Sequence, residues 1–464
     1  MTQNSRTVSR RDFMRGSLAG AAYLSLGGLA PSAFAEPAKP PNFVVIFCDD
    51  LGYADLGCFG SQLISTPNVD RMASEGMKFT DFYSAAPVCT PSRAALMTGC
   101  YPLRVSLPTV ISYKHTIGIN PDEITIAELL KTRGYATACI GKWHLGWQKQ
   151  FLPTRHGFDY YYGLPYSNDM KYNEQAVPLI RGEEIIEQPA VLETLTERYT
   201  DEAISFITKN QDRPFFLYLP HTFPHTPLAV SERFKGKSKR GLYGDVVECI
   251  DWSTGRILDT LKELGLDDNT LVIFTSDNGP WLIRGKDGGS AFPLRSGKGS
   301  TWDGGMREPC IMRWPGRIPA GTTCSEMATM MDLYPTMAKL AGARVPTDRI
   351  IDGKDILPLM SGAHGAKSPH EAFFYYRQEQ LQAVRSGRWK LVLAHRDMND
   401  KVDVPQALYD LKADIGEATD VSARYPSIVK RLTALIERMW EDLGDAITGA
   451  PGKNRRPPGS VSRG

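Results

Sequence analysis

Four short runs of continuous apolar residues punctuate the first two thirds of the chain. They lie at residues 42–48, 135–140, 214–219 and 271–275, and they are rich in β-branched and aromatic side chains. Runs of this length and composition are typical of strands that are buried on both faces, as in parallel sheets. Each run stops abruptly at a polar cluster, so the pattern predicts four buried strands with polar residues at their carboxyl ends.

Helical periodicity fills the intervals between these runs. Apolar residues recur at helical spacing over residues 124–133, 196–210 and 245–264. Strands that alternate with helices predict an α/β fold, in which a large, mostly parallel mixed sheet lies between helices. Ligands bind such sheets beyond the carboxyl ends of the strands, which is where all four polar clusters fall. We therefore expect the clusters to converge on one cleft.

The pattern changes near residue 345. Strand-like runs and one amphipathic helix follow, at residues 372–376, 389–393 and 428–443. They predict a smaller C-terminal α+β subdomain over residues 345–448, beside a larger domain over residues 42–344. Residues 449–464 are rich in Pro, Gly, Ser and basic side chains, and we expect this tail to be disordered.

The N-terminus has the features of an export signal. Paired arginines at 10–11 precede an apolar run at 18–30, and small residues at 33–35 resemble a cleavage site. The pattern predicts a twin-arginine signal peptide over residues 1–35 and a Pro-rich linker over 36–41; an uncleaved N-terminal helix is the alternative. We expect a bacterial protein that is periplasmic or secreted, without stable membrane insertion, because no later stretch is apolar enough to span a bilayer.

Composition narrows the class of partners. The 464 residues carry a net charge of only +2, which gives no support for nucleic acid or an acidic membrane as a partner. Eight cysteines are scattered without a C-x-x-C pair, which argues against a zinc ribbon and leaves any disulfide pairing open.

Two acidic pairs follow predicted strands. Asp49-Asp50 comes after the first run, and Asp277-Asn278 comes after the fourth. One such pair alone is more typical of a turn or a helix cap. Two pairs at strand ends favour a metal site, and oxygen donors of this charge suit Ca²⁺ first and Mg²⁺ second.

A single cysteine opens a run of good helix formers. Cys89 precedes Pro91 and Arg93, so it should lie at or just before a helix N-terminus. Backbone N–H groups at that position favour an anion, and Arg93 would add a guanidinium one turn later. The alternative is that Cys89 is only a small buried apolar residue.

Further cationic and proton-transferring groups stand in the loops after the strands. The candidates are Arg93, Lys142, Lys298, His144 and His225. A single lysine or histidine is usually structural, but Lys142 and His144 flank a tryptophan in a glycine-bounded loop, which is unusual for a surface turn. His221 and His225 compete for one role, and His225 is the stronger candidate.

Taken in order, these positions resemble the signature of the sulfatase family in the alkaline-phosphatase superfamily. The matching motifs are Asp49-Asp50, Cys89-Thr90-Pro91-Ser92-Arg93, Gly141-Lys142-Trp143-His144-Leu145-Gly146, His225, Ser276-Asp277-Asn278-Gly279 and Gly297-Lys298. The resemblance runs from residue 42 to about residue 443 and implies an alkaline-phosphatase-like sandwich. Within the family the chain resembles the arylsulfatase A and N-acetylgalactosamine-6-sulfatase group. The run Gly163-Leu164-Pro165-Tyr166-Ser167 fits that group, with Ser167 as a sulfate or leaving-group contact.

The resemblance implies a sulfuric ester hydrolase with a modified cysteine. In this family the signature cysteine is oxidised to Cα-formylglycine, and the hydrate of that aldehyde is the nucleophile. The metal ligands would then be Asp49, Asp50, Cys89, Asp277 and Asn278. The cations Arg93, Lys142 and Lys298 would stabilise the sulfuryl oxygens. His225 would protonate the departing alcohol, and His144 would take the proton from the second hydroxyl.

The resemblance also implies partners. We expect a sulfated carbohydrate or an aryl sulfate as substrate, and a formylglycine-generating enzyme and the twin-arginine translocase as partners in maturation. The expected specificity loops lie around 171–191 and 284–292 and in the C-terminal subdomain. Three positions depart from the family pattern, namely Cys48, Cys100 and Asp303. Glutamate is usual at the last of these positions.

Two other functions stay open. Relatives in the superfamily that hydrolyse phosphonate monoesters or phosphodiesters use the same aldehyde and a similar metal site. Alternatively, the chain could be an inactive glycan-binding protein in which Cys89 is unmodified.

Overall fold

The structure is a computed structural model that describes residues 39–172, 175–397 and 399–461. The predicted signal peptide over residues 1–35 and the first half of the linker, residues 36–38, lie outside the described residues. Among the described helices, none combines the length and the apolar character that crossing a bilayer requires.

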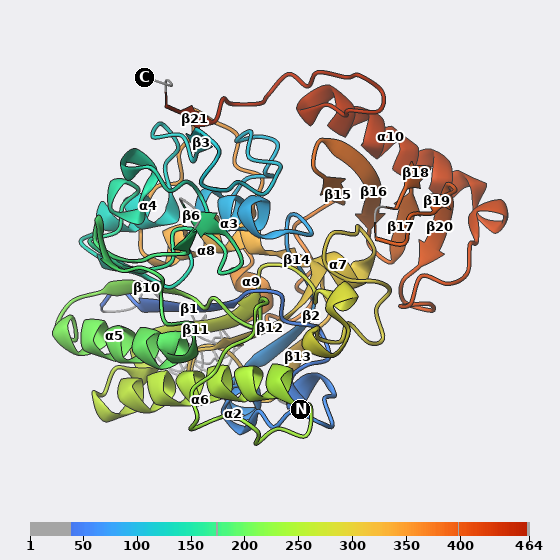
Figure 1. The fold of residues 1–464 in the computed structure, drawn as a ribbon. Helices are drawn as coiled ribbons and strands as arrows, with labels where there is room; N and C mark the ends of the chain where they lie inside the picture. Colours follow the sequence, from blue (N-terminus) through green and yellow to red (C-terminus); the bar gives the residue numbers. More distant parts are fainter. Residues whose placement is uncertain (1–38, 173–174, 398, 462–464) are drawn as a thin grey trace, which may run out of the picture. The chain divides into compact units, whose positions relative to one another are not determined.

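An eleven-stranded sheet forms the centre of the fold (Figure 1). Its order is β13-β2-β12-β11-β1-β10-β4-β5-β8-β9, and β14 also pairs with β2. The bounds are β1 Asn42–Cys48, β2 Met77–Tyr83, β4 Ala136–Ile140, β5 Tyr160–Gly163, β8 Leu179–Arg181, β9 Glu184–Glu187, β10 Phe215–Pro220, β11 Thr270–Ser276, β12 Arg307–Arg313, β13 Thr322–Cys324 and β14 Ala328–Thr329.

The four strands that the sequence predicts stand side by side. They are β11, β1, β10 and β4, and every pair of neighbours among them is parallel. In the register, Phe43 of β1 lies opposite Phe216 of β10 and Leu271 of β11, and all three side chains are buried. Because both faces of these strands are covered, their sequences are continuously apolar. The predicted parallel core of the α/β fold is confirmed.

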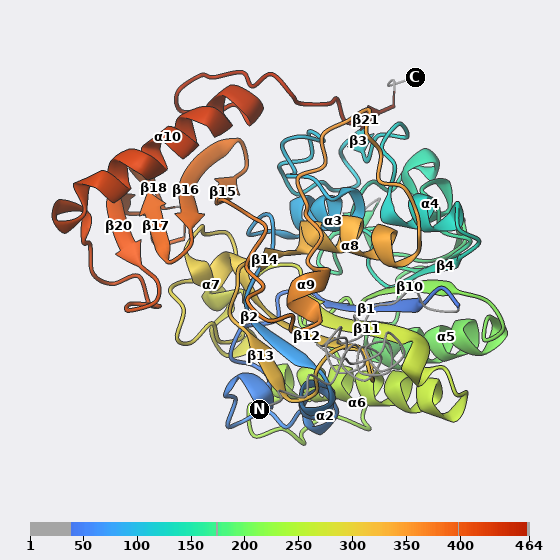
Figure 2. The same cartoon turned by 180° about the vertical axis from the view of Figure 1, so that it is seen from behind.

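Helices cover both faces of this sheet, as Figures 1 and 2 show from opposite sides. One face carries α2 (Pro67–Glu75), α5 (Leu195–Lys209) and α6 (Leu242–Glu263). The other carries α3 (Cys89–Thr98), α4 (Ile126–Lys131) and α8 (Leu333–Leu340). The predicted helices correspond to α4, α5 and α6 and differ from them only at their ends.

Local sequence sets two of the helix ends near the site. At the start of α4, Thr125 and Glu128 form a capping box, in which each side chain accepts a hydrogen bond from the other residue's backbone N–H. At the end of α3, Gly99 adopts φ 69°, and its N–H donates to the carbonyl of Ala95. A left-handed C-cap of this kind favours glycine because a Cβ is disfavoured there.

The C-terminal residues form a second, antiparallel sheet. Its order is β15-β16-β17-β20, over Phe373–Arg377, Gln380–Ser386, Trp389–Val392 and Ala407–Asp410. Helix α10 (Pro426–Leu443) packs against β16 and β17. The predicted α+β character of this region is confirmed, and β16 is a strand that the sequence patterns did not single out. The remaining short elements are β3 Ile117–Gly118, β6 Lys171–Tyr172, β7 Gln175–Ala176, α7 Asp303–Met306, α9 Leu357–Met360, β18 His395–Arg396, β19 Asp403–Val404 and β21 Gly459–Ser460.

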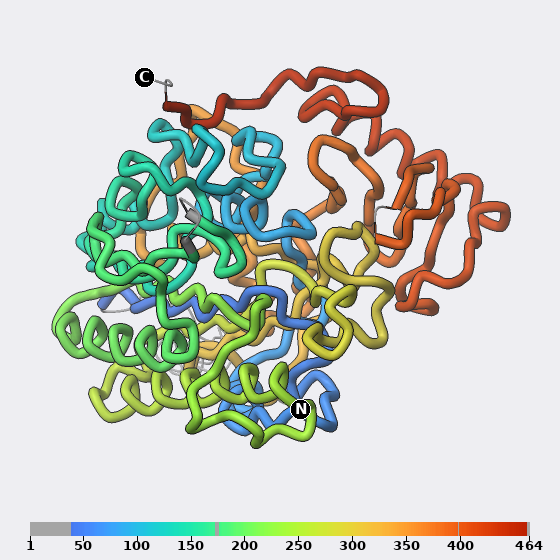
Figure 3. The backbone as a smooth tube through the Cα atoms, in the orientation of Figure 1, coloured from blue at the N-terminus to red at the C-terminus, as the bar shows by residue number. Residues whose placement is uncertain are grey.

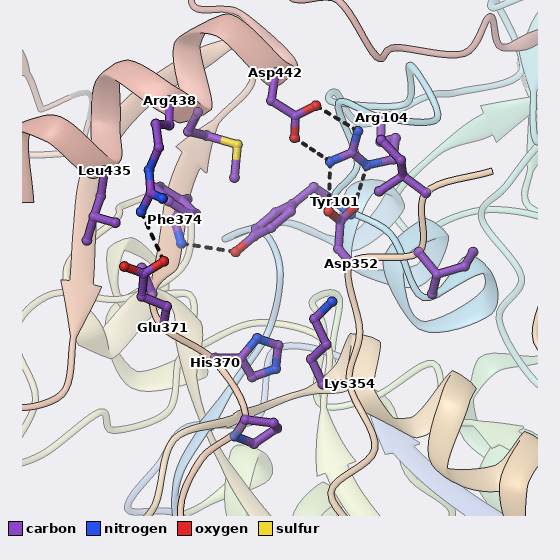
Figure 4. A pocket seen from close by; sticks show the side chains of 15 residues that line it. Tyr101, Arg104, Asp352, Lys354, His370, Glu371, Phe374, Leu435, Arg438 and Asp442 are labelled. Atoms are coloured by element: carbon purple, nitrogen blue, oxygen red, sulfur yellow. Dashed lines mark hydrogen bonds and ion pairs between the residues drawn. The ribbon is translucent and has the colours of Figure 1, made fainter. Parts of the chain in front are cut away.

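A pocket of about 460 Å³ marks the junction between α10 and the loop after α3 (Figure 4). Arg104, which is buried, forms ion pairs of 2.7 Å with both Asp352 and Asp442. On the opposite side of the pocket, Arg438 pairs with Glu371 at 2.9 Å. These charged groups neutralise one another, and none of the predicted site residues lines this pocket.

The expectation of a disordered C-terminal tail is wrong for residues 449–461. This segment runs back from α10 to the first part of the chain (Figure 3), where β21 pairs with β3. Arg456 forms an ion pair of 2.6 Å with the buried Glu123, and its backbone N–H donates to the carbonyl of Arg104. The basic composition that suggested disorder thus supplies specific partners for buried acceptors.

Candidate active site

The acidic residues meet at the carboxyl ends of β1 and β11. Asp49 and Asp50 follow β1, Asp277 and Asn278 follow β11, and all four side chains are buried. The backbone N–H of Asp50 donates to Asp277 Oδ1 at 3.2 Å, and Asn278 Nδ2 donates to Asp50 Oδ1 at 2.8 Å. The predicted convergence of these two pairs is confirmed.

Cys89 is the first residue of α3 and faces this cluster. Its thiol donates to Asp49 Oδ1 at 3.6 Å, and the Nζ of Lys298 lies 3.6 Å from the sulfur. Burial and the nearby Asp49 carboxylate raise the pKa of the Cys89 thiol to about 12. As an unmodified thiol, Cys89 is therefore protonated and a poor nucleophile at neutral pH.

Arg93 joins two strand ends one helical turn after Cys89. Its Nη2 and Nε donate to Asp277 Oδ2 at 2.8 and 3.2 Å, and its Nη1 donates to the carbonyl of Lys142 at 2.8 Å. The side chain has no exposed surface. Arg93 thereby ties the loop after β11 to the loop after β4.

Two lysines complete the charge of the cluster. The Nζ of Lys142 pairs with Asp49 and donates to Ser167 Oγ at 3.2 Å. The Nζ of Lys298 lies 2.7 Å from Asp50 Oδ1. Burial alone would lower the pKa of Lys298, but the Asp50 carboxylate outweighs it and holds that pKa above its ordinary value. Both lysines and Ser167 are therefore where the sequence predicts them.

His225 lies beside Ser167 and is held by Asn168. The Nδ2 of Asn168 donates to the carbonyls of His225 and Pro227, which fixes the orientation of its amide. Asn168 Oδ1 therefore accepts from His225 Nδ1 at 2.9 Å, and Nε2 lies 3.8 Å from Asp50 Oδ2. Burial, and then the charge of Lys298, hold the pKa of His225 well below its usual range, so the ring is neutral.

His144 presents one free ring nitrogen. Its Nε2 lies 2.8 Å from the carbonyl of Ile111 and so carries the proton. Its Nδ1 is buried and has no hydrogen-bond partner among the described residues. Burial holds the pKa of His144 well below its usual range, so Nδ1 offers an unused lone pair. Among the described residues, no hydrogen bond or ion pair joins His144 directly to Cys89.

His221 does not belong to this cluster. Neither of its ring nitrogens has a hydrogen-bond partner among the described side chains, and burial lowers its pKa to about 3. Its ring lies 6.5 Å from the ring of Tyr199. The structure therefore favours His225 over His221, as the sequence does.

The donor groups fit a divalent cation. Ligand atoms of Asp49, Asp50, Cys89 and His225 lie within 4.8 Å of one another. Beside them, Asn278 Oδ1 is buried and accepts no hydrogen bond from any described residue, which is the environment that a cation would satisfy. Burial and the Asp49 charge raise the pKa of Asp277 to about 7, a sign of crowded carboxylates. The oxygens of these residues suit a hard cation, although His225 also lies within reach.

Sequence reasoning missed two residues of the site, Asn168 and Trp281. The indole of Trp281 lies 4.4 Å from Lys298 Nζ and 5.2 Å from the His225 ring. Arg284 stacks on the same ring at 3.8 Å. The only signal for either residue is proximity in sequence, because Asn168 follows Ser167 directly and Trp281 closely follows Asn278.

The fold and the site together define a class of hydrolase, and comparison with known proteins identifies it. The chain belongs to the sulfatase family: the family model described as Sulfatase matches residues 41–343, and one described as N-sulphoglucosamine sulphohydrolase, C-terminal, matches residues 297–442. It is thus a sulfuric ester hydrolase of the alkaline-phosphatase superfamily.

Several relatives are named enzymes. N-acetylgalactosamine-6-sulfatase of Canis lupus familiaris is 44% identical, over 79% of this chain and 74% of the relative. Arylsulfatase A of Homo sapiens is 38% identical, over 92% of this chain and 93% of the relative. Among solved structures, the PsFucS1 sulfatase from Pseudoalteromonas sp. has a TM-score of 0.82 at 28% identity, covering 97% of each chain.

Proposed function

We propose that this chain removes sulfate from sulfated carbohydrate, by means of a Cα-formylglycine made from Cys89 and a bound Ca²⁺. The observation that carries the proposal is the position of the Cys89 sulfur, which lies 3.6 Å from both Asp49 and Lys298 at the edge of the acidic cluster. Support for the substrate class comes from relatives. One is named an N-acetylgalactosamine-6-sulfatase, and a similar structure, of Ps i-CgsB at 34% identity with a TM-score of 0.76, holds k-i-k-neocarrahexaose.

The protein side chains divide into a cation-binding group and an anion-binding group. Carboxylate or amide oxygens of Asp49, Asp50, Asp277 and Asn278 would hold the Ca²⁺. When bound, the ion adds positive charge beside the sulfuryl oxygens, and the hydrated aldehyde supplies the nucleophile. Three cationic side chains lie beside this acidic cluster, namely Arg93, Lys142 and Lys298. Ser167 is fixed next to Lys142. The charges of the three cationic side chains would stabilise the anionic transition state.

The two histidines suit opposite proton transfers. His225 stands beside Ser167 and Lys298, where a bound sulfate ester would raise its pKa and let it protonate the departing alcohol. The Nδ1 of His144 is buried with an unused lone pair, and we assign it to accept the proton from the second hydroxyl of residue 89. In this proposal the acid and the base are therefore two different residues.

Replacement of Cys89 tests the proposal. The Cys89→Ser variant cannot form the aldehyde in a host that modifies only cysteine, so sulfate release from an aryl sulfate should fall at least about 10³-fold. The matched control is Cys324→Ser, at a half-buried thiol on the edge strand β13, and it should keep wild-type activity. Peptide mass spectrometry of the wild type should show the aldehyde at residue 89. Full activity in Cys89→Ser would contradict the scheme, and an intact thiol in an inactive wild type would favour a glycan-binding role.

The choice between sulfate and phosphonate needs a direct comparison of rates. A phosphonate monoester hydrolase of Agrobacterium radiobacter shares the fold, with a TM-score of 0.62 at 20% identity. We expect aryl sulfates to be hydrolysed faster than aryl phosphonate monoesters. A clear preference for the phosphonate would reverse this assignment.

We also propose that the chain is exported through the twin-arginine translocase after a formylglycine-generating enzyme has acted on it. The support is the sequence of residues 1–35, with its paired arginines and its small residues before Glu36. N-terminal sequencing of protein from the periplasm or medium should begin at Glu36. Recovery of the full chain in the cytoplasm alone would contradict export.

A further inference from the structure

The segment from Lys298 to Asp303 connects the site to the C-terminal sheet. It lies between β11 and β12 in sequence, yet several of its hydrogen-bonding groups are met by residues more than 70 positions later. Asn399 Nδ2 donates to the carbonyl of Lys298 at 2.8 Å, and Arg377 Nε donates to the carbonyl of Gly299 at 2.9 Å. Thr301 Oγ1 donates to Gln382 Oε1 at 2.8 Å.

A buried ion cluster fixes the far end of this segment. The Nζ of Lys390, on β17, donates to the carbonyl of Thr301 and to Asp303 Oδ1, both at 2.9 Å. It also pairs with Glu417 Oε1 at 2.6 Å, while Glu417 Oε2 accepts the N–H of Asp303 at 2.7 Å. Lys390, Asp303 and Glu417 have no exposed surface. Removing one partner of such a buried cluster leaves an uncompensated charge, so the arrangement is rigid.

The other side of the segment faces the catalytic groups. The N–H of Gly299 donates to the carbonyl of Pro87, two residues before Cys89, and the N–H of Lys298 donates to the carbonyl of Pro280. From this backbone the Lys298 side chain reaches Asp50 at 2.7 Å and Cys89 at 3.6 Å. The peptide that follows Lys298 is therefore held between the C-terminal sheet and the approach to Cys89.

We infer that the C-terminal region is a positioning element for Lys298, and that Asn399, in the turn between β18 and β19, acts on this lysine through the backbone carbonyl of Lys298. A lysine stem has four rotatable carbons, so the position of its ammonium depends on where its backbone is fixed. The Lys298, Gly299 and Thr301 carbonyls all accept from side chains of the C-terminal part. The inference rests on the catalytic role proposed for Lys298.

A double-mutant cycle tests this coupling. We expect Asn399→Ala to lower kcat on an aryl sulfate about tenfold with little change in KM, because a small displacement of a catalytic group mainly affects the transition state. In a Lys298→Ala background the same change should have no further effect, since the group that Asn399 positions is absent. The matched control is Asp400→Ala, at the exposed neighbouring residue, which should keep wild-type kcat in both backgrounds.

A second variant gives an independent measurement. Thr301→Val removes the hydroxyl that bonds to Gln382 and preserves the side-chain shape. It should therefore also lower kcat in the wild-type background and have no further effect on kcat in the Lys298→Ala background. Equal losses of kcat in both backgrounds, or wild-type kcat in Asn399→Ala, would overturn the positioning role and leave the proposed function intact. Wild-type kcat in Lys298→Ala would instead overturn the role of Lys298 and the inference together.

Discussion

At the scale of single residues, the site is a set of buried charges that hold one another in place. Arg93 is satisfied by Asp277 and the Lys142 carbonyl, and Lys298 by Asp50. Pairing of this kind offsets the cost of removing each charge from water. The neutral members, His225 and Asn168, are held by direct hydrogen bonds instead. Replacing one of them therefore tests the orientation of the site without changing its net charge.

We predict that Asn168→Ala lowers kcat for sulfate release about tenfold, because His225 loses the acceptor that sets its tautomer and orientation. Steady-state kinetics on an aryl sulfate would measure it. Asp169→Ala, at the exposed next residue, is the matched control and should be silent. Equal kinetics in the two variants would show that Asn168 does not orient His225.

We predict that chelation of divalent metal abolishes sulfate release and that Ca²⁺ restores it more fully than Mg²⁺. The reason is that Asn278 Oδ1 and the surrounding carboxylates offer oxygen ligands in a buried cluster. Elemental analysis of the purified protein and activity before and after chelation would measure this effect. Unchanged turnover by a protein shown to be free of metal would contradict it.

At the scale of elements, helices support one another's ends across long stretches of sequence. Thr66, at the N-cap of α2, makes no side-chain capping bond. Instead, Asp251 Oδ1 on α6 accepts the N–H groups of Asn68 at 3.0 Å and Val69 at 2.8 Å. Asp251 is 4% exposed, and its burial raises its pKa to about 6.

This raised pKa predicts a pH dependence of stability. The unfolded carboxyl titrates near pH 4 and the folded one near 6, so its stabilising contribution is complete below pH 4 and is lost as pH rises to 6. The loss is about 3 kcal/mol for a shift of this size. Asp251→Asn keeps an oxygen for both N–H groups and should flatten this part of the curve in urea unfolding between pH 4 and 8. If the free energy of unfolding of the variant depended on pH as it does in the wild type, Asp251 would not be the group responsible.

How well each element could be predicted from the sequence depends on how its burial shapes the apolar pattern. Strand β1 spans the predicted residues 42–48, because a strand buried on both faces is continuously apolar. The site residues were predictable because they follow such strands. In contrast, β2 was not singled out because it is partly exposed and alternates in burial at its start, which gives a weaker signal. Strand β12 is buried throughout, but the charged residues Arg307, Glu308 and Arg313 interrupt its apolar pattern. The contacts of Asn399 and Lys390 were not predictable, because polar contacts between distant segments leave no periodicity.

At the scale of the whole molecule, the chain closes on itself. The segment after α10 returns to the first third of the sequence, where Arg456 meets Glu123 and β21 pairs with β3. Arg104 binds Asp442 of α10 from the other direction. The C-terminal part is therefore attached both at the Lys298 segment and at this junction.

We predict that Arg456→Ala lowers the free energy of unfolding by about 1–3 kcal/mol, because it removes two hydrogen bonds to the buried Glu123 carboxylate and leaves Arg349, 4.0 Å away, as a weaker partner. Lys453→Ala removes an exposed ion pair with Glu441 from the same segment and should lower the free energy of unfolding far less, because water already screens this pair. Denaturant unfolding of both variants would measure the difference. Equal free energies of unfolding in the two variants would show that this segment contributes little to the stability of the fold.

The depth of Cys89 has a consequence for how such a protein matures. Its side chain is 2% exposed, at the start of a helix whose residues are all buried. An enzyme cannot reach this thiol once the surrounding strands and loops have folded around it. The catalyst proposed to convert Cys89 would therefore have to act on the nascent or still unfolded polypeptide, and the relative timing of synthesis, conversion and folding would decide what fraction of molecules becomes active.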